Sequence, residues 1–246
     1  MTHTALSSSL PILHETEHWL AINKPANMLV HRGESLSHGR QFVLQTLRDQ
    51  LAQAVYPVHR LDKATSGVLL LAKSSAAASQ LIKQWPQTQK RYLAVVRGFA
   101  PESSHIDLPL ALPRDRTNPN WQAGPEKPAQ TDCYCLDRIE LPLQIDKYPS
   151  SRYSLVQCLP KTGRKHQIRR HLRHLGHPIL CDTRYGKNRH YHYFRDQLAI
   201  DRMLLHAAEL QFVCPWQQQE ITLSAPLDAT FLGLLHRFGW QTHAPR

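Results

Sequence analysis

The sequence predicts an α+β fold, in which separated strands form a sheet and a few helices pack outside it. Two patterns indicate this. Short runs rich in apolar and β-branched residues occur at 68–72, 92–96 and 153–159, and such runs are typical of strands. Segments 41–54 and 75–85 instead repeat apolar residues at the spacing of an amphipathic helix.

Local signals place the first elements along the chain. Residues 1–10 predict a loose tail, and residues 12–22 predict a strand that stops at Lys24-Pro25. Helix 41–54 would bury one face, which carries Val43, Leu44, Leu47 and Leu51. Helix 75–85 is expected to end at Pro86, because proline lacks the N–H that a helix requires.

A proline-rich stretch separates the two halves of the chain. Residues 101–130 contain six prolines and few apolar anchors, which predicts an extended insertion over the surface. Strand 153–159 follows, and segments 203–212 and 221–223 supply closing strands. Because 246 residues are few for two full domains, we expect residues 11–246 to form a single domain.

The composition favours a polyanionic partner. Lys and Arg number 30 against 19 Asp and Glu, which gives a net charge of +11 and a pI near 9.7. Nucleic acid is the better candidate than a membrane surface, since no apolar run approaches the ~18 residues of a spanning helix. Residues 1–9 lack the pattern of a signal peptide, so we expect a cytoplasmic protein.

The cysteines predict neither disulfides nor a metal site. Five cysteines are an odd number and have no repeated spacing. The pair Cys133 and Cys135 alternates as strand residues do, and no second ligand pair has zinc spacing. We therefore expect free thiols and no metal.

Asp62 is the first candidate for chemistry. It stands in segment 59–67 (His-Arg-Leu-Asp-Lys-Ala-Thr-Ser-Gly), which leads into the apolar strand 68–72. A rigid strand can aim a side chain of the preceding turn into a cleft. The alternative is a local ion pair between Arg60 and Asp62, with Thr65 hydrogen-bonding the turn.

A basic segment at 161–173 is the second candidate, and we expect it to be helical. It contains six cations and no acid: Lys161, Arg164, Lys165, Arg169, Arg170 and Arg173. Like charges at this density repel one another, so phosphates or a buried carboxylate are expected to neutralise them. Ile168, Leu172 and Leu175 would dock the helix onto the core. A solvated basic face is the alternative.

Several segments resemble, in the same order, the motifs of the RluA family of pseudouridine synthases. They are the Asn-Lys-Pro opening at 23–31, the His-Arg-Leu-Asp signature at 59–67, the Lys-x-Tyr strand at 90–98, the Thr-Gly-Arg-x-His-Gln-Ile-Arg segment at 161–172 and Gly-His-Pro-Ile at 176–179. The resemblance extends from about Leu13 to Ala207. It therefore covers most of the chain.

The resemblance implies a pseudouridine synthase fold, with a mixed, mostly antiparallel sheet and helices around a central cleft. Such an enzyme breaks the bond between ribose C1′ and uracil N1 of a flipped uridine, rotates the base and rejoins it through C5, without cofactor or metal. Asp62 would be the catalytic carboxylate. Attack at C1′, addition at C6 and proton abstraction at C2′ all remain open for it.

Arg169 and Tyr92 complete the catalytic set that the resemblance implies. Burial disfavours an ionised carboxylate, and a cation ~4 Å away at an effective dielectric of ~20 returns about 4 kcal/mol. Arg169 would supply this cation to Asp62. Tyr92 would stack on the base, which is worth ~1–3 kcal/mol, and is a candidate to take the C5 proton. Core packing is the alternative for Tyr92.

Further substrate contacts are implied by the same resemblance. Arg60 resembles the arginine that fills the gap left by the extruded base, and Leu205 and His206 resemble an apolar pocket wall. The other candidates for substrate binding are His59, Thr65, Arg164, Lys165 and Arg170. Two positions depart from the family pattern, since Asn27 and Cys181 both stand where the family has glycine.

Within the family, the chain is most similar to members that modify uridine 65 of bacterial tRNA. The similarity rests on segment 148–153, Lys165, the Arg170-His171-Leu172 variant, the compact length and the late Phe238-Gly239-Trp240. We therefore expect a monomer that acts on tRNA, without an S4 RNA-binding module or an obligatory protein partner. Ribosomal RNA is the alternative target. A non-catalytic RNA-binding protein and a metal-dependent RNA hydrolase are the other classes left open.

Overall fold

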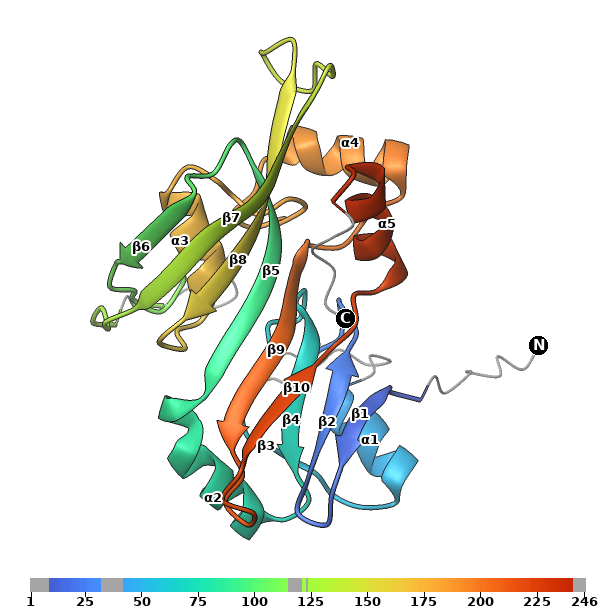
Figure 1. Ribbon diagram of the computed structural model, residues 1–246, viewed down its shortest axis with the longest axis vertical. Helices are drawn as coiled ribbons and strands as arrows, with labels where there is room; N and C mark the ends of the chain where they lie inside the picture. The colour runs from blue at the N-terminus through green and yellow to red at the C-terminus, as the bar shows by residue number, and fades with distance from the viewer. Residues whose placement is uncertain (1–8, 32–41, 115–120, 123, 241–246) are drawn as a thin grey trace, which may run out of the picture. The chain divides into compact units, whose positions relative to one another are not determined.

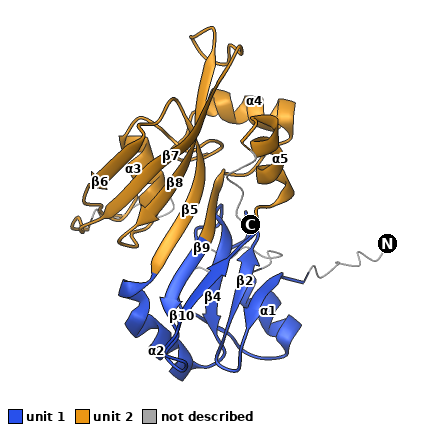
Figure 2. Ribbon diagram, viewed as in Figure 1, with its two compact units in different colours: residues 1–88, 209–226 blue, residues 89–208, 227–246 orange. Residues whose placement is uncertain are grey.

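The computed structural model describes residues 9–31, 42–114, 121–122 and 124–240, which fall into two compact units (Figures 1 and 2). Unit 1 comprises residues 1–88 and 209–226, and unit 2 comprises residues 89–208 and 227–246. Strand β9 (Leu205–Val213) contributes to both. Since each unit draws on two separate parts of the chain, no single linker divides them. The predicted single domain remains a prediction.

Unit 1 is built on an antiparallel sheet. Its strands are β1 (Ile12–Glu15), β2 (Trp19–Lys24), β3 (Tyr56–Pro57), β4 (Ser66–Ala72) and β10 (Glu220–Ser224). Strand β4 is buried along its whole length and pairs with β2 on one edge, which fits its nearly unbroken apolar sequence. The predicted strand 68–72 is thus confirmed, with a start two residues earlier.

The single strand expected at 12–22 is wrong, because the chain turns between β1 and β2. Thr16 Oγ1 accepts the N–H of Trp19 at 3.1 Å and that of His18 at 3.3 Å. A threonine hydroxyl that accepts the N–H groups two and three residues later in the chain stabilises a turn. The two strands therefore pair as an antiparallel hairpin.

Both helices predicted in unit 1 are present. Helix α1 (Val43–Leu51) is shorter than the expected 41–54 and ends at Ala52, whose φ of 51° is left-handed; Gln41 lies outside the described residues. Helix α2 (Ser75–Gln84) starts at the cap Ser74, whose side chain accepts the Ala77 N–H, and it runs into a short 3₁₀ turn, η1 (Trp85–Gln87). The α-helix therefore ends just before Pro86, as predicted, although one residue earlier than the expected Trp85.

Unit 2 contains a second run of antiparallel strands, in the order β5, β8, β7, β6. Their bounds are β5 (Gln89–Arg97), β6 (Ser103–Asp107), β7 (Gln130–Leu141) and β8 (Ser151–Pro160). One face of this sheet packs through Leu93, Val95 and Leu155 against helices α4 (Asn188–Leu198) and α5 (Ala229–Arg237). Strands and helices together confirm the α+β class. The central cleft remains a prediction.

The basic helix is shorter than expected. Helix α3 covers Gln167–His174, so the first three cations of segment 161–173 precede it. His166 adopts a left-handed φ of 58° at the helix start, which breaks any helical continuation toward the N-terminus. Ile168 and Leu172 are buried, as the predicted docking face requires, whereas Leu175 ends the helix half-buried.

The proline-rich stretch is only in part the expected surface insertion. Strand β6 lies inside it and pairs with β7, and Leu110 forms a bridge with Lys127. Residues 115–120 and 123 lie outside the described part of the chain. Among the described residues, no helix has the length and apolarity needed to span a membrane.

Candidate active site

Asp62 opens a tight turn in unit 1. Its carbonyl accepts the Thr65 N–H at 3.1 Å, and strand β4 begins one residue later. Thr65 and Ser66 are buried, whereas Asp62 itself is half-buried. The turn that feeds a core strand is therefore present as predicted. Its backbone is held by this hydrogen bond and by the strand that follows.

A buried lysine supports this turn. Lys24 ends strand β2 with no solvent exposure, and its Nζ donates to the carbonyls of Pro25 at 2.7 Å, Met28 at 2.9 Å and Lys63 at 3.2 Å. Lys63 directly follows Asp62. The ammonium thus ties the 24–28 turn to the turn that carries the candidate catalytic acid. The left-handed φ of 64° at Asn27 explains how asparagine replaces a glycine there.

His59 has a structural partner on each side. Its Nε2 accepts the Leu70 N–H at 3.0 Å, and its ring stacks on Trp85 with centroids 4.3 Å apart. These contacts pin the start of segment 59–67 to strand β4. Arg60, the next residue, is exposed. Substrate binding by His59, Arg60 and Thr65 remains a prediction.

Arg169 lies in unit 2 and forms a buried ion pair with Asp182 through two hydrogen bonds, an arrangement called the fork below. Nε contacts Asp182 Oδ2 at 2.7 Å and Nη2 contacts Oδ1 at 2.9 Å, while the two side chains are 8% and 0% exposed. Burial disfavours the charged carboxylate, but the hydrogen bonds and charge of Arg169 outweigh it and lower the pKa of Asp182. Asp182 therefore stays ionised at neutral pH.

Tyr185 lies against the same guanidinium. Its ring centroid is 5.0 Å from Arg169 Cζ, 5.6 Å from Arg184 Cζ and 5.9 Å from Arg173 Cζ. Its hydroxyl is 3.0 Å from His166 Nδ1, at the start of α3. One aromatic ring therefore gathers three cations on this side of unit 2.

Tyr92 lies on the sheet face that α3 covers. It is opposite Cys158 in β8, and Cys158 is opposite Cys133 in β7, so the three side chains share a face. Two residues before Cys133, Thr131 Oγ1 accepts a hydrogen bond from Gln167 Nε2 at 2.9 Å. Because Gln167 begins α3, Tyr92 and the helix that carries Arg169 lie on one side of the sheet. Tyr92 is half-buried.

Leu205 and His206 are both buried where β9 begins, and the His206 ring packs near Phe231. That environment is compatible with an apolar wall. Cys181, which replaces a glycine, adopts a left-handed φ of 60° and is buried. Cys181 thus holds a backbone conformation that glycine adopts without strain.

Two of the predicted RNA-binding cations hydrogen-bond the backbone of the proline-rich stretch. Arg164 Nε donates to the Pro128 carbonyl at 3.0 Å, and Arg170 Nη1 donates to the Ala111 carbonyl at 2.6 Å. Lys165 is exposed. Part of the charge that the sequence attributes to substrate binding thus holds the chain's own backbone, which composition alone does not reveal.

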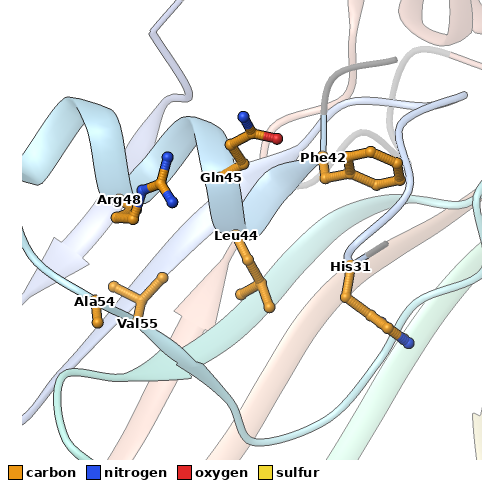
Figure 3. Close-up of a pocket in the computed structure, with 7 residues that line it drawn as sticks. All are labelled: His31, Phe42, Leu44, Gln45, Arg48, Ala54 and Val55. Carbon is orange, nitrogen blue, oxygen red and sulfur yellow. The ribbon is translucent and has the colours of Figure 1, made fainter. Parts of the chain in front are cut away.

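Figure 3 shows a pocket of about 390 Å³ in unit 1, and none of the predicted catalytic residues is among the described residues that line it. Gln45 and Arg48 project from α1 at its border, and Leu44 and Val55 supply apolar lining. Arg48 also forms an exposed ion pair with Asp49 at 2.8 Å. The described residues that line the pocket include no carboxylate, so they do not offer the chemistry that the Asp62 turn does.

Sequence reasoning missed three supporting residues, namely Lys24, Gln167 and Asp182. Lys24 and Gln167 stand inside recognised motifs, so a motif reading could have asked what each of them binds. Gln167 Oε1 accepts from Thr162 Oγ1 and from the Arg164 N–H, which fixes the approach to α3. Asp182 follows Cys181 in the sequence, but nothing there indicates that its partner is Arg169.

The comparisons agree with the RluA-family resemblance. The family model for RNA pseudouridylate synthase matches residues 18–174. A Pasteurella multocida protein named tRNA pseudouridine synthase C is 45% identical over 240 residues, covering 96% of this chain and 99% of the relative. A protein of the same name from Vibrio cholerae is 44% identical, covering 94% of this chain and 97% of the relative.

Solved structures agree as well. Human RNA pseudouridylate synthase domain containing 4 superposes with a TM-score of 0.70 at 26% identity, covering 95% of each chain. Human RNA pseudouridylate synthase domain containing 1 gives a TM-score of 0.67 at 25% identity, covering 93% of this chain and 90% of the other. The predicted pseudouridine synthase fold is therefore confirmed. The chain belongs to the RNA pseudouridylate synthase family and is an RNA pseudouridine synthase, an isomerase.

Proposed function

We propose that this enzyme converts uridine 65 of tRNA to pseudouridine, with Asp62 as the catalytic carboxylate. The observation that carries the proposal is the His-Arg-Leu-Asp segment at 59–67, held in a fixed turn at the start of a core strand. Relatives named tRNA pseudouridine synthase C, which match almost the whole chain, support tRNA as the substrate.

Asp62 would act on an everted nucleotide. The C1′–N1 bond breaks, the uracil rotates, the C1′–C5 bond forms, C5 loses its proton and N1 gains one. A flipped base would cover the half-buried carboxylate, and unstacking it costs a few kcal/mol. Stacking on Tyr92 would offset ~1–3 kcal/mol of that cost.

Arg169 would keep Asp62 anionic once water is excluded. Its guanidinium is already desolvated and oriented by Asp182, so little reorganisation is needed when the substrate arrives. Arg60 would occupy the gap left in the RNA, with Leu205 and His206 lining the base pocket. Lys165 would contact phosphates, and Arg164 and Arg170 would act beside it while holding the proline-rich stretch.

Mapping pseudouridine at single-nucleotide resolution tests the target. A strain that lacks the gene is predicted to lose the modification at tRNA position 65 and to regain it with the wild-type gene. Loss at a ribosomal RNA position, with tRNA unchanged, would contradict the proposed substrate and favour the alternative target. No change at any uridine would contradict an enzymatic role for this chain in RNA modification.

A further inference from the structure

We propose that Asp182 is a positioning residue for the isomerisation, because it fixes the plane of the Arg169 guanidinium that would face the reacting carboxylate. The inference rests on the proposed function, in which Arg169 serves Asp62. Asp182 itself would touch neither substrate nor reacting atoms. It would act through Arg169.

The contact has the geometry needed for orientation. A guanidinium is planar, and one hydrogen bond leaves it free to swing about that bond. The paired contacts of 2.7 Å and 2.9 Å through Nε and Nη2 remove this freedom. The Tyr185 ring, 5.0 Å from Cζ, lies against the same group. Arg169 is thus constrained by a carboxylate and by an aromatic ring.

Asp182 is itself immobilised by the backbone around it. Its Oδ1 also accepts the N–H of Arg184 at 2.9 Å and the N–H of Tyr185 at 3.1 Å. Its carbonyl accepts the Gly186 N–H at 2.8 Å, and a Cβ at Gly186 would lie only 2.4 Å from that oxygen. The loop therefore closes tightly around the aspartate, so the carboxylate provides a rigid reference for α3.

Because of this geometry, one substitution at Asp182 can disturb the orientation of Arg169 without unfolding the loop. In Asp182→Asn, the amide oxygen can still accept the two backbone N–H groups, so the loop keeps its hydrogen bonds. The amide NH₂ then replaces Oδ2 and meets Arg169 Nε, which is also a donor. The paired contact with Arg169 is lost, whereas the hydrogen bonds that hold the loop are kept.

A double-mutant cycle under single-turnover conditions tests the inference. Pseudouridine formation is measured for the wild type, Asp182→Asn, Arg169→Lys and the double variant. We expect Asp182→Asn to slow the reaction about 100-fold, the range seen when one preorganised donor is lost, with RNA affinity changed less than about threefold. Because Arg169→Lys already removes the fork, adding Asp182→Asn to it is expected to slow the reaction no further.

Matched variants keep the test decisive. Asp196→Asn alters an exposed carboxylate that pairs with Arg195 and is expected to react at the wild-type rate. Asp182→Glu keeps the charge but displaces the fork, so it should recover part of the rate lost in Asp182→Asn. It carries the test if Asp182→Asn fails to fold, and a wild-type rate for Asp182→Glu would then overturn the inference.

Three outcomes separate the possibilities. A folded Asp182→Asn enzyme with the wild-type rate would overturn the positioning role. Multiplying losses in the double variant would also overturn it, because Asp182 would then act independently of Arg169. Full activity of Asp62→Asn, measured in parallel, would instead refute the proposed function itself.

Discussion

Asp62 in unit 1 and Arg169 in unit 2 are both supported by a buried charged residue, but the supports differ in kind. Lys24 steadies the Asp62 turn through three backbone carbonyls. Asp182 instead accepts two hydrogen bonds directly from the Arg169 side chain. The turn that carries the acid is thus held through main-chain acceptors, and the cation is held through a side-chain ion pair.

This difference predicts different consequences of mutation. Losing a support made of backbone contacts should unfold the turn and cost stability. Losing a side-chain fork should leave the fold in place and cost rate. Three further changes break or sharpen this comparison.

The largest effect is expected for Lys24→Met. The methionine fills the space but leaves the carbonyls of Pro25, Met28 and Lys63 without this donor. The three bonds are part-buried and have a charged donor, and hydrogen bonds to charged groups contribute about 1.5–3 kcal/mol each, so we expect the free energy of unfolding to fall by about 3 kcal/mol or more. Urea denaturation measures it. Lys63→Met, at an exposed neighbour, is the control, and equal stability of the two variants would contradict the backbone-support role.

A smaller effect, on RNA binding and on rate, is expected at Tyr92. Tyr92→Phe retains a ring for stacking, whereas Tyr92→Ala loses ~1–3 kcal/mol of stacking and should weaken binding of the substrate RNA about tenfold or more. Single-turnover rates at saturating RNA then isolate the hydroxyl. If Tyr92→Phe binds normally but reacts slowly, the hydroxyl has a chemical role. Equal behaviour of wild type and Tyr92→Ala would leave only core packing.

The smallest effect concerns acid stability of unit 2. His190 is buried, with Nε2 accepting from Arg97 Nε at 3.1 Å and Nδ1 2.9 Å from the Tyr153 hydroxyl. Burial, followed by the charge of Arg97, lowers the pKa of His190 to about 4. Between about pH 6.5 and 4 the unfolded chain therefore binds the extra proton, and stability falls with falling pH.

The slope for one such proton is at most about 1.4 kcal/mol per pH unit, and it vanishes below pH ~4, where both states are protonated. Burial also lowers the pKa of His171, so the measurement compares wild type with His190→Gln. Unfolding free energies at pH 7, 6 and 5 should converge as the pH falls. Parallel curves for the two proteins would show that His190 is not the titrating group.

The same comparison explains what the sequence could predict. The Asp62 side depends on neighbours in the chain, since the acid, the turn and strand β4 lie within a few residues. Local motifs report such arrangements well. The left-handed backbone at Asn27 was predictable as well, because asparagine stands where the family has glycine and tolerates this conformation.

The Arg169 side depends on contacts that composition does not encode. Asp182 is thirteen positions away along the chain, and Gln167 binds strand β7 across 36 positions. Helix α4 was missed because His190 and Phe194 are its only fully buried residues, which leaves no apolar stripe. Helix α3 was predicted to be too long because histidine is not a helix-breaking residue. The sequence therefore gives no sign of the left-handed backbone at His166.

The most direct test of Asp62 is single-turnover pseudouridine formation by purified wild type and Asp62→Asn, with RNA binding and thermal unfolding measured on the same samples. Asparagine keeps the size of the side chain but removes the carboxylate. We predict that Asp62→Asn folds and binds the RNA like the wild type and forms no detectable pseudouridine. Product formation at the wild-type rate would contradict the assignment of Asp62 as the catalytic group.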